Sequence, residues 1–381
     1  MSNYSEIIDF IKNQYPSKEF IPLHEPYFGG NEKSYVIDTI ESTFVSSVGA
    51  YVDKFEILMA ELTKTQKAIA VVNGTCALQV ALRLSGVESG DEVITQALTF
   101  IATINAIIYN GASPIFIDVD IDTMGLSPNA VEIFLEEFGE IKNGVCYNKK
   151  TNKKIAACMP MHTFGFPVHL DELNKICTKW NIPLVEDAAE SIGSEYKEMP
   201  TGSFGKLGVF SFNGNKIVTS GGGGAIVTND FELGIKAKHL TTTAKVPHPF
   251  EYVHDEIGYN YRMPNINAAL ACAQLEQLNS FIQNKRTLAL EYSTYFASKG
   301  INFRTELPNT KANYWLMCIQ LNNKEDRDSF LTETNKNRVM TRPIWQLIFK
   351  SPLYSKFQRD AQKNAIFLEE RIVNIPSSVR L

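Results

Sequence analysis

Residues 208–230 read GVFSFNGNKIVTSGGGGAIVTND, with one lysine, Lys216, between an apolar run and four consecutive glycines. Residues 209–212 predict one strand, and residues 226–227 predict another. Glycines 221–224 leave the backbone between them free to adopt positive φ, and such a turn can bring main chain close to a bound group. An isolated stretch of this kind more often forms a glycine hairpin with an exposed lysine on its rim. A reactive role for Lys216 therefore needs support from other parts of the sequence.

Upstream of this stretch, apolar strands alternate with helices from residue 67 to residue 187. This βα rhythm predicts an α/β fold with a mainly parallel central sheet, and it places the binding loops at the carboxyl ends of the strands. No G-x-G-x-x-G follows the first strand, so a nicotinamide-binding Rossmann domain fits poorly. The polar segment 138–153 predicts a loop or a hairpin that leaves the sheet.

The length of 381 residues exceeds one typical domain and predicts two. The composition shifts toward aromatic residues and histidine at residues 246–262, before a long helix that begins near residue 265. We therefore expect a large domain with an N-terminal arm over residues 1–250, and a smaller α+β domain over residues 251–381.

Charge, cysteine and histidine content narrow the class of protein. The formal net charge is −5 with no concentrated basic tract, which disfavours nucleic-acid binding. The N-terminus has neither a signal-peptide pattern nor an 18-residue apolar run, so we expect a cytoplasmic protein with no membrane partner. The six cysteines form no C-x-x-C pair and the six histidines show no metal-binding spacing, so we expect reduced thiols and no metal site.

Polar and aromatic side chains stand where several of the predicted strands end. Gly74 and Thr75 follow a strand and open a helix, whose N–H groups would suit a phosphate, although a plain N-cap fits the same residues. Phe100 lies at the next strand-to-helix turn. Asp187, at the end of a buried strand, is either an N-cap or a site residue, and Ser211 ends the strand before Lys216.

Pyridoxal 5′-phosphate (PLP) requires the functions that these side chains offer. Its phosphate needs N–H and hydroxyl donors, and its ring needs an aromatic neighbour. Its pyridine nitrogen needs a carboxylate so that it stays protonated, and its aldehyde needs a lysine amine. One cofactor would therefore explain the whole set.

Five motifs carry a resemblance to a known family: NGTCALQVAL (73–82), TFIATINAI (99–107), VEDAAESIGS (185–194), FSFNGNKIVTSGGGG (210–224) and GYNYRMPNINAAL (258–270). With these motifs the chain resembles the DegT/DnrJ/StrS family of sugar aminotransferases over essentially its whole length. The resemblance implies a fold-type I PLP-dependent transferase that acts as a homodimer, with active sites at the subunit interface.

The resemblance also implies a role for each motif residue. Lys216 would bind the cofactor aldehyde, Asp187 would pair with the pyridine nitrogen, and Phe100 would stack on the ring. The phosphate would be held by Gly74, Thr75, Ser211 and, from the partner subunit, Asn260.

Two residues depart from the family pattern. Glu190 stands where the family usually has Gln or His beside the phenolic oxygen of the cofactor, so a carboxylate and a phenolate would have to share a proton. Gly222 stands at the acidic position of the common T-G-E-G-G turn, so no role of that acid transfers to this chain.

The family's usual amino donor is L-glutamate, and its acceptor is a nucleotide-linked keto sugar. VSSVGAYV (45–52) and VMTRPIW (339–345) look like the LegC-type branch, which implies a UDP-linked 4-keto-6-deoxy-N-acetylhexosamine and bacillosamine or legionaminic acid synthesis. The alternatives are a dTDP-linked 3-keto sugar, a GDP-linked 4-keto sugar, or a PLP-fold regulatory protein without catalysis.

Four residues are candidate substrate contacts: Ser47, Tyr51, His162 and Arg342. A helix cap, a core aromatic, a satisfied loop histidine and a surface ion pair, respectively, explain them equally well.

Overall fold

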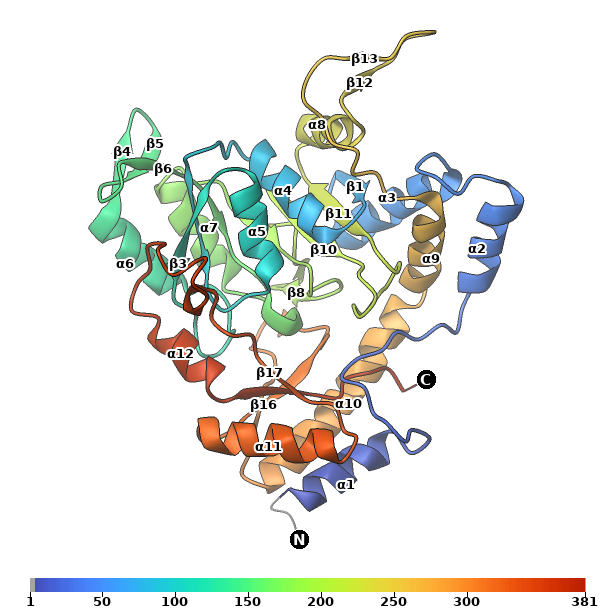
Figure 1. Cartoon of the computed structure of the whole chain (residues 1–381), viewed down its shortest axis with the longest axis vertical. Helices are drawn as coiled ribbons and strands as arrows, with labels where there is room; N and C mark the ends of the chain where they lie inside the picture. The colour runs from blue at the N-terminus through green and yellow to red at the C-terminus, as the bar shows by residue number, and fades with distance from the viewer. Residues whose placement is uncertain (1–3, 381) are drawn as a thin grey trace.

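The computed structural model describes residues 4–380, and a twisted sheet forms the centre of its larger part (Figure 1). Parallel bridges from Cys158 to Leu184 and from Met161 to Asp187 join two ladders into one sheet. The strands follow one another across it in the order β1 (Lys67–Val71), β11 (Gly224–Thr228), β10 (Leu207–Ser211), β7 (Val185–Asp187), β6 (Lys153–Met159), β2 (Glu92–Gln96) and β3 (Ser113–Ile117).

Only β11 runs against the other strands, so the prediction of a mainly parallel sheet is confirmed. Strands such as β2 and β11 are buried along their whole length, as strands covered on both faces must be. The helices of this part are α3 (Ala50–Thr63), α4 (Gly74–Leu84), α5 (Ile101–Tyr109), α6 (Pro128–Phe138), α7 (Leu170–Lys179) and α8 (Phe231–Thr241). The segment 138–153 forms the predicted hairpin, with strands β4 (Gly139–Lys142) and β5 (Val145–Asn148).

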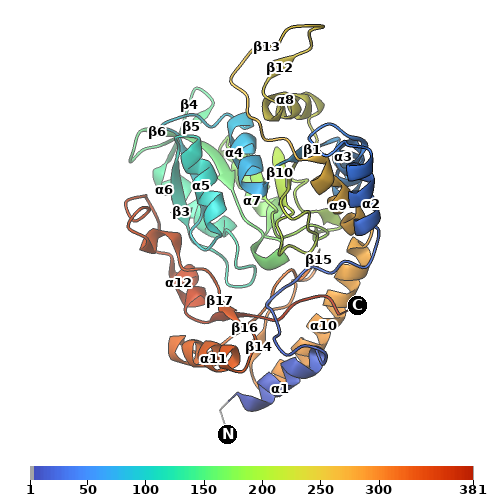
Figure 2. The same ribbon diagram turned by 45° about the vertical axis from the view of Figure 1, so that its right-hand side comes forward.

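The C-terminal part contains a second, antiparallel sheet below the first (Figure 2). Its order is β14 (Asn302–Phe303), β16 (Met317–Gln320), β18 (Ile372–Ile375) and β17 (Arg342–Pro343). Helices α10 (Leu278–Ser298), α11 (Lys324–Lys336) and α12 (Lys363–Glu369) accompany it. Short elements complete the chain: β8 (Glu195–Tyr196), β9 (Met199–Pro200), β15 (Thr310–Lys311), and the 3-10 helices η1 (Thr163–Gly165) and η2 (Ile348–Lys350).

The N-terminal helix α1 (Ser5–Gln14) packs on the C-terminal elements (Figures 1 and 2). The Tyr4 ring meets the Phe330 ring edge-on at 5.1 Å, and the Phe10 ring stacks on the Tyr295 ring at 3.6 Å. The first residues thus contribute to the packing of the last ones. The domain boundary after residue 250 stays a prediction. Helix α1 precedes that boundary in the sequence, but its aromatic contacts are with residues that follow it.

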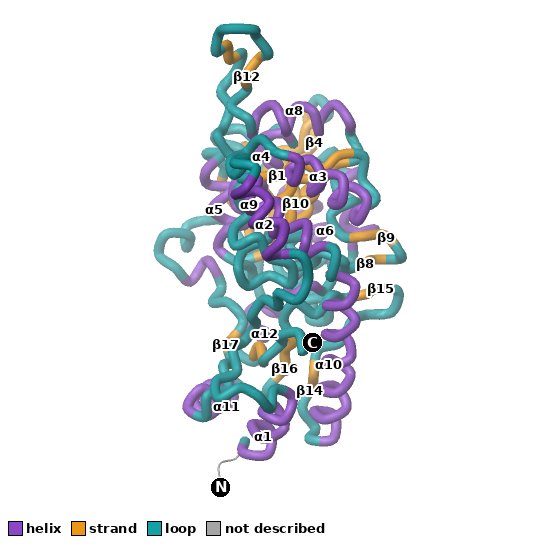
Figure 3. Tube along the Cα trace, turned by 90° about the vertical axis from the view of Figure 1, so that its right-hand side faces the viewer, coloured by secondary structure: helices purple, strands orange, loops and turns teal. Residues whose placement is uncertain are grey.

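The long helix expected from residue 265 is two helices, α9 (Asn265–Leu275) and α10, with the break at residues 276–277. Helix α9 lies beside α2 (Glu32–Glu41) and α3 (Figures 1 and 3). Helix α10 then leads away into the C-terminal part. Among residues 4–380, no helix is both long enough and apolar enough to cross a membrane.

The compositional shift at residues 246–262 corresponds to a hairpin that projects from the body of the molecule (Figures 1 and 3). Its strands are β12 (Lys245–Val246) and β13 (Val253–His254), and its tip exposes Phe250 and Tyr252 to 91% and 83%. Beyond the hairpin the chain returns to the sheet edge, where the Val72 N–H donates to the Tyr261 carbonyl at 2.8 Å.

Candidate active site

A cavity of about 660 Å³ lies where strands β1, β2, β7 and β10 end, as the βα topology predicts. Residues of the C-terminal sheet and its loops close the opposite side. The cavity is lined by every residue that we assigned to catalysis or cofactor binding except Asn260, namely Gly74, Thr75, Phe100, Asp187, Glu190, Ser211 and Lys216. Arg342, a predicted substrate contact, lines it as well.

Lys216 lies on the loop between β10 and β11, and its side chain is only 12% exposed. Its Nζ atom is 3.2 Å from Glu190 Oε1 and 3.8 Å from the centre of the Trp315 ring. The lysine therefore points into the cavity between a carboxylate and an aromatic face. The alternative of an exposed rim lysine does not describe this geometry.

The four glycines of residues 221–224 differ in backbone conformation and in surroundings, and the freedom to adopt positive φ is used at one of them. Only Gly221 has a positive φ, of 75°. At Gly224 a Cβ would lie 2.5 Å from the Asn73 carbonyl carbon, and at Gly223 it would lie 2.2 Å from Ser220 Oγ. These two glycines allow close packing. Gly222 has no atom within 4 Å of such a Cβ.

Glu190 is a buried carboxyl, 3% exposed, at the side of the lysine. Its Oε2 atom accepts the Phe164 N–H at 2.9 Å, and its Oε1 atom receives the Lys216 ammonium. Burial raises the pKa of Glu190 to about 7, although the Lys216 charge opposes the rise. The carboxyl can therefore gain or lose a proton near neutral pH.

Asp187 ends strand β7 with its side chain in the cavity wall and 2% exposed. Its Oδ2 atom accepts the Thr103 hydroxyl at 2.8 Å, and its Oδ1 atom accepts the Ala189 N–H at 3.2 Å. Burial raises the pKa of this carboxyl above its ordinary value, while these two hydrogen bonds lower it. A cation facing Asp187 would offset the cost of burying its charge.

Gly74, Thr75 and Ser211 form a cradle of donors at the start of α4. The N–H groups of Gly74 and Thr75 lie in the first turn, where the helix supplies no acceptor. Within residues 4–380, the Thr75 and Ser211 hydroxyls have no hydrogen-bond partner. A Cβ at Gly74 would lie 2.9 Å from Ser211 Cβ, so only glycine lets the serine reach the helix end. The donor set suits an anion such as a phosphate.

Phe100 and Arg342 stand at the margin of the cavity. Phe100 is the residue before α5 and is 51% exposed. The Arg342 guanidinium donates to Asn335 Oδ1 at 3.0 Å and to the Thr341 carbonyl at 2.9 Å. No carboxylate pairs with Arg342 in the described part of the chain. An unpaired cation is therefore available beside the cavity.

Residues 26–381 match the model of the DegT/DnrJ/EryC1/StrS aminotransferase family. The chain belongs to this family. The sugar aminotransferase is 38% identical over 360 residues to the GDP-perosamine synthase of Escherichia coli O157:H7, covering 94% of this chain and 93% of that protein. It is 35% identical to the GDP-perosamine synthase of Vibrio cholerae, with 94% of each chain covered.

Among solved structures, the fold is similar to Helicobacter pylori PseC, an aminotransferase involved in the biosynthesis of pseudoaminic acid. The TM-score is 0.85 at 25% identity, and 94% of each chain is covered. The expected fold-type I class of PLP-dependent transferases is thus confirmed, and so is transaminase activity with PLP as cofactor. The resemblance to a LegC-type branch within the family stays a prediction.

The side chains of the cavity fit PLP. Lys216 offers an amine. Asp187 offers a buried carboxylate that contacts no cationic side chain in the described part of the chain. The start of α4 offers N–H and hydroxyl donors. These groups match, one for one, the aldehyde, the pyridine nitrogen and the phosphate of the cofactor.

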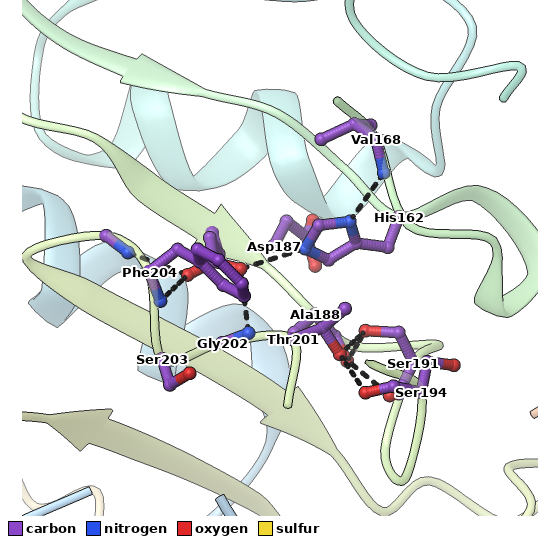
Figure 4. Close-up of polar contacts among 12 residues, drawn as sticks. His162, Val168, Asp187, Ala188, Ser191, Ser194, Thr201, Gly202, Ser203 and Phe204 are labelled. Atoms are coloured by element: carbon purple, nitrogen blue, oxygen red, sulfur yellow. Dashed lines mark hydrogen bonds and ion pairs between the residues drawn. The ribbon is translucent and has the colours of Figure 1, made fainter. Parts of the chain in front are cut away.

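The structure contradicts the prediction that His162 contacts the substrate (Figure 4). Its ring is fully buried, Nδ1 accepts the Val168 N–H at 3.3 Å, and Nε2 lies 3.1 Å from Glu186 Oε2. Because Nδ1 accepts, the ring proton is on Nε2 and is donated to Glu186. Glu186 also accepts the N–H groups of Gly202, Phe204 and Gly205. His162 therefore contacts strand β7 through Glu186, the residue before Asp187.

Ser47, Tyr51 and Asn260 do not line the cavity of this chain. Tyr51 lies on α3 with its ring 5.1 Å from that of Tyr35 on α2. Asn260 is exposed, and its Oδ1 atom accepts the Arg262 guanidinium. The substrate roles of Ser47 and Tyr51 stay predictions, as does the cofactor role of Asn260 from the partner subunit.

Sequence reasoning missed several residues of the cavity wall. Thr103 lies in α5, one helical turn after Phe100, so the spacing predicts that the two side chains lie on the same face of the helix. Trp315 and Trp345 come from the C-terminal part, far along the chain. Trp345 ends the VMTRPIW stretch quoted above but is not among the predicted site residues, and Trp315 lies in none of the quoted motifs. Phe164 lies between them, with its ring centre 4.8 Å from that of Trp345.

Proposed function

We propose that the enzyme transfers the amino group of L-glutamate to a GDP-linked keto sugar. The observation that carries this proposal is the convergence of Lys216, Asp187, Glu190 and the phosphate-type cradle on one cavity, in a chain similar along its length to GDP-perosamine synthases. The UDP-linked sugar implied by the LegC-type resemblance and a dTDP-linked sugar are the alternatives.

Each residue contributes a separate task in this proposal. PLP, when bound, acts as the electron sink for the carbon that loses its proton. We assign the movement of that proton to the Lys216 amine, because Lys216 is the one lysine among the described residues of the cavity wall. Asp187 supplies a fixed negative charge opposite a protonated ring nitrogen, and Thr103 and the Ala189 N–H hold that carboxylate in place.

Glu190 controls a second proton. Its carboxyl, with a pKa of about 7, lies within hydrogen-bond distance of the lysine amine. A protonated Glu190 can donate to a phenolate oxygen, whereas an ionised Glu190 would repel it. We therefore expect Glu190 to be protonated when the cofactor is bound. A protonated Glu190 would donate a hydrogen bond to the phenolic oxygen, as Gln or His would at this position.

Arg342 is the group that we assign to the nucleotide-linked sugar. Among residues 4–380 its guanidinium has no carboxylate partner, and only its Nη1 atom donates a hydrogen bond. A diphosphate has the charge and the oxygen geometry that a guanidinium binds best. The neighbouring wall contains Trp345, Gln346 and Asn374, which offer an aromatic face and amide groups to a sugar.

We also propose that the enzyme acts as a homodimer. Apolar side chains of α2 and the following loop are exposed, with Ile40 at 56% and Phe44 at 57%, and the projecting hairpin exposes Phe250 and Tyr252. Such surfaces usually mark an interface. Asn260 follows that hairpin, and this position suits a residue that contributes to the cavity of the partner.

Incubation with L-glutamate and a panel of GDP-, UDP- and dTDP-linked 4-keto and 3-keto sugars tests the substrate. We expect 2-oxoglutarate and a GDP-linked amino sugar, identified by NMR. Turnover only with the UDP- or dTDP-linked sugars would reject the GDP assignment. Lys216→Ala is the control and should abolish turnover without changing the oligomeric state. Purified protein without cofactor absorbance or turnover would favour a regulatory protein.

A further inference from the structure

Trp315 makes two contacts with the loop that carries Lys216. Its indole Nε1–H donates to the Asn215 carbonyl at 2.8 Å, and Asn215 immediately precedes the lysine. Its ring face lies 3.8 Å from Lys216 Nζ, within the range of a cation–π contact. The side chain is 5% exposed and lines the cavity. One residue from the C-terminal part thus holds both the backbone and the side-chain end of the lysine.

Trp315 is itself held by the segment that carries Glu190. Its N–H donates to Asn313 Oδ1 at 2.8 Å, and Asn313 Nδ2 donates to the carbonyls of Glu190 and Ile192, both at 2.9 Å. Asn313 is fully buried. The indole and the Glu190 carboxylate therefore form the two sides of a single fixed frame around the lysine amine.

Two aromatic residues next to this frame have left-handed backbone conformations. Tyr314, directly before Trp315, has φ 50°, and Phe164, whose N–H donates to Glu190, has φ 57°. Bulky side chains rarely adopt this conformation, and it persists where the surrounding structure fixes a residue for a purpose. Both strained residues orient a group that contacts Lys216.

We propose that Trp315 is a positioning residue that seats the Lys216 amine against Glu190 whenever the amine is not bonded to the cofactor. The proposal rests on the function proposed above for Lys216. In both halves of a transamination the lysine is released and must move a proton, and a free lysine side chain has many conformations. A position between the indole face and the Glu190 carboxyl group limits these conformations and keeps Nζ near the reacting atoms.

Trp345 provides a matched control. It lines the same cavity, and its ring packs on Phe164, but it makes no contact with Lys216 in the described structure. Loss of Trp345 should alter the cavity wall without releasing the lysine. Trp315→Phe separates the two contacts of Trp315, because phenylalanine keeps a ring face but cannot donate to Asn215.

The test measures how accessible the Lys216 amine is. Holoenzyme is first treated with L-glutamate to release the lysine and is then exposed briefly to acetic anhydride, and Lys216 acetylation is quantified by mass spectrometry. We expect Trp315→Leu to be acetylated about tenfold faster than wild type, as the loss of one well-placed cation–π contact implies, and Trp315→Phe about threefold faster. Trp345→Leu should remain within about twofold of wild type.

Single-turnover kinetics supply the second readout. In Trp315→Phe the rate of proton transfer with L-glutamate should fall about tenfold while the half-saturating glutamate concentration changes less than about twofold. Acetylation and turnover rates like those of wild type in a folded Trp315→Leu protein would overturn the proposal. If the leucine variant fails to fold, unchanged rates in Trp315→Phe overturn it.

The proposed function fails differently. If Lys216 of wild type is acetylated equally before and after glutamate treatment, the lysine is not bonded to the cofactor, and the role of Lys216 is wrong whatever Trp315 does.

Discussion

Replacing Glu190 with glutamine removes a titrating group from the cavity, and we expect it to change how stability depends on pH. Glu190 has a pKa of about 7 against an ordinary value of 4.5. Between these values the unfolded chain has released the proton while the folded chain retains it, so wild type loses stability as pH rises through this window. At about 1.4 kcal/mol for each tenfold change in proton affinity, the loss is on the order of 3 kcal/mol. The Lys216 charge, which favours the carboxylate, keeps it from being larger.

Urea unfolding of the cofactor-free, full-length protein measures this effect at several pH values between about 5 and 8, followed by fluorescence and circular dichroism together. The difference in unfolding free energy between wild type and Glu190→Gln should change by about 3 kcal/mol over the range. Glu61→Gln, at an exposed position of α3, is the control and should give a curve parallel to wild type. Parallel curves for wild type and Glu190→Gln, within about 1 kcal/mol, would refute the raised pKa.

Three further substitutions test other parts of the site. Gly74→Ala brings a Cβ to 2.9 Å from Ser211 Cβ. Displacement of the serine should weaken PLP binding about tenfold, measured by cofactor absorbance in equilibrium dialysis. Unchanged affinity would show that Gly74 and Ser211 do not hold the phosphate. Asp187→Asn should keep the cofactor but slow the reaction with L-glutamate at least about 100-fold in single-turnover assays, and a smaller loss would contradict its pairing with the ring nitrogen. Arg342→Ala should raise KM for the nucleotide-linked sugar about tenfold with little change in KM for glutamate; an equal rise in both would reject a role specific to the sugar.

The strand-end residues could be predicted from the sequence because parallel strands place their carboxyl ends at one edge. Gly74, Asp187 and Ser211 follow different strands, far apart along the chain, yet all three line one cavity. Topology alone accounts for this, since β1, β7 and β10 run in the same direction.

Other features could not be predicted, because they depend on packing between distant segments. His162 also follows a parallel strand, but its ring turns behind the sheet toward Glu186, and the sequence does not reveal on which side of a strand end a side chain lies. Helix α1 has an apolar face that could pack on either part of the molecule. Trp315 meets Lys216 across about 100 residues of chain.

One side of the cavity is formed by the large sheet and the other by the C-terminal part. The side formed by the large sheet carries Asp187, Ser211 and Lys216, whose proposed tasks follow from the chemistry of PLP and would be the same for any acceptor. The other side carries Arg342 and Trp345 from the C-terminal part, and we propose that this side contributes to the choice of sugar. Because Trp315 belongs to the same part and contacts Lys216, our proposal predicts that a sugar that shifts the C-terminal wall would also shift the lysine. The proposal therefore predicts that acceptor recognition and proton transfer are coupled through packing, so that substitutions chosen to change the sugar change the rate of both half-reactions.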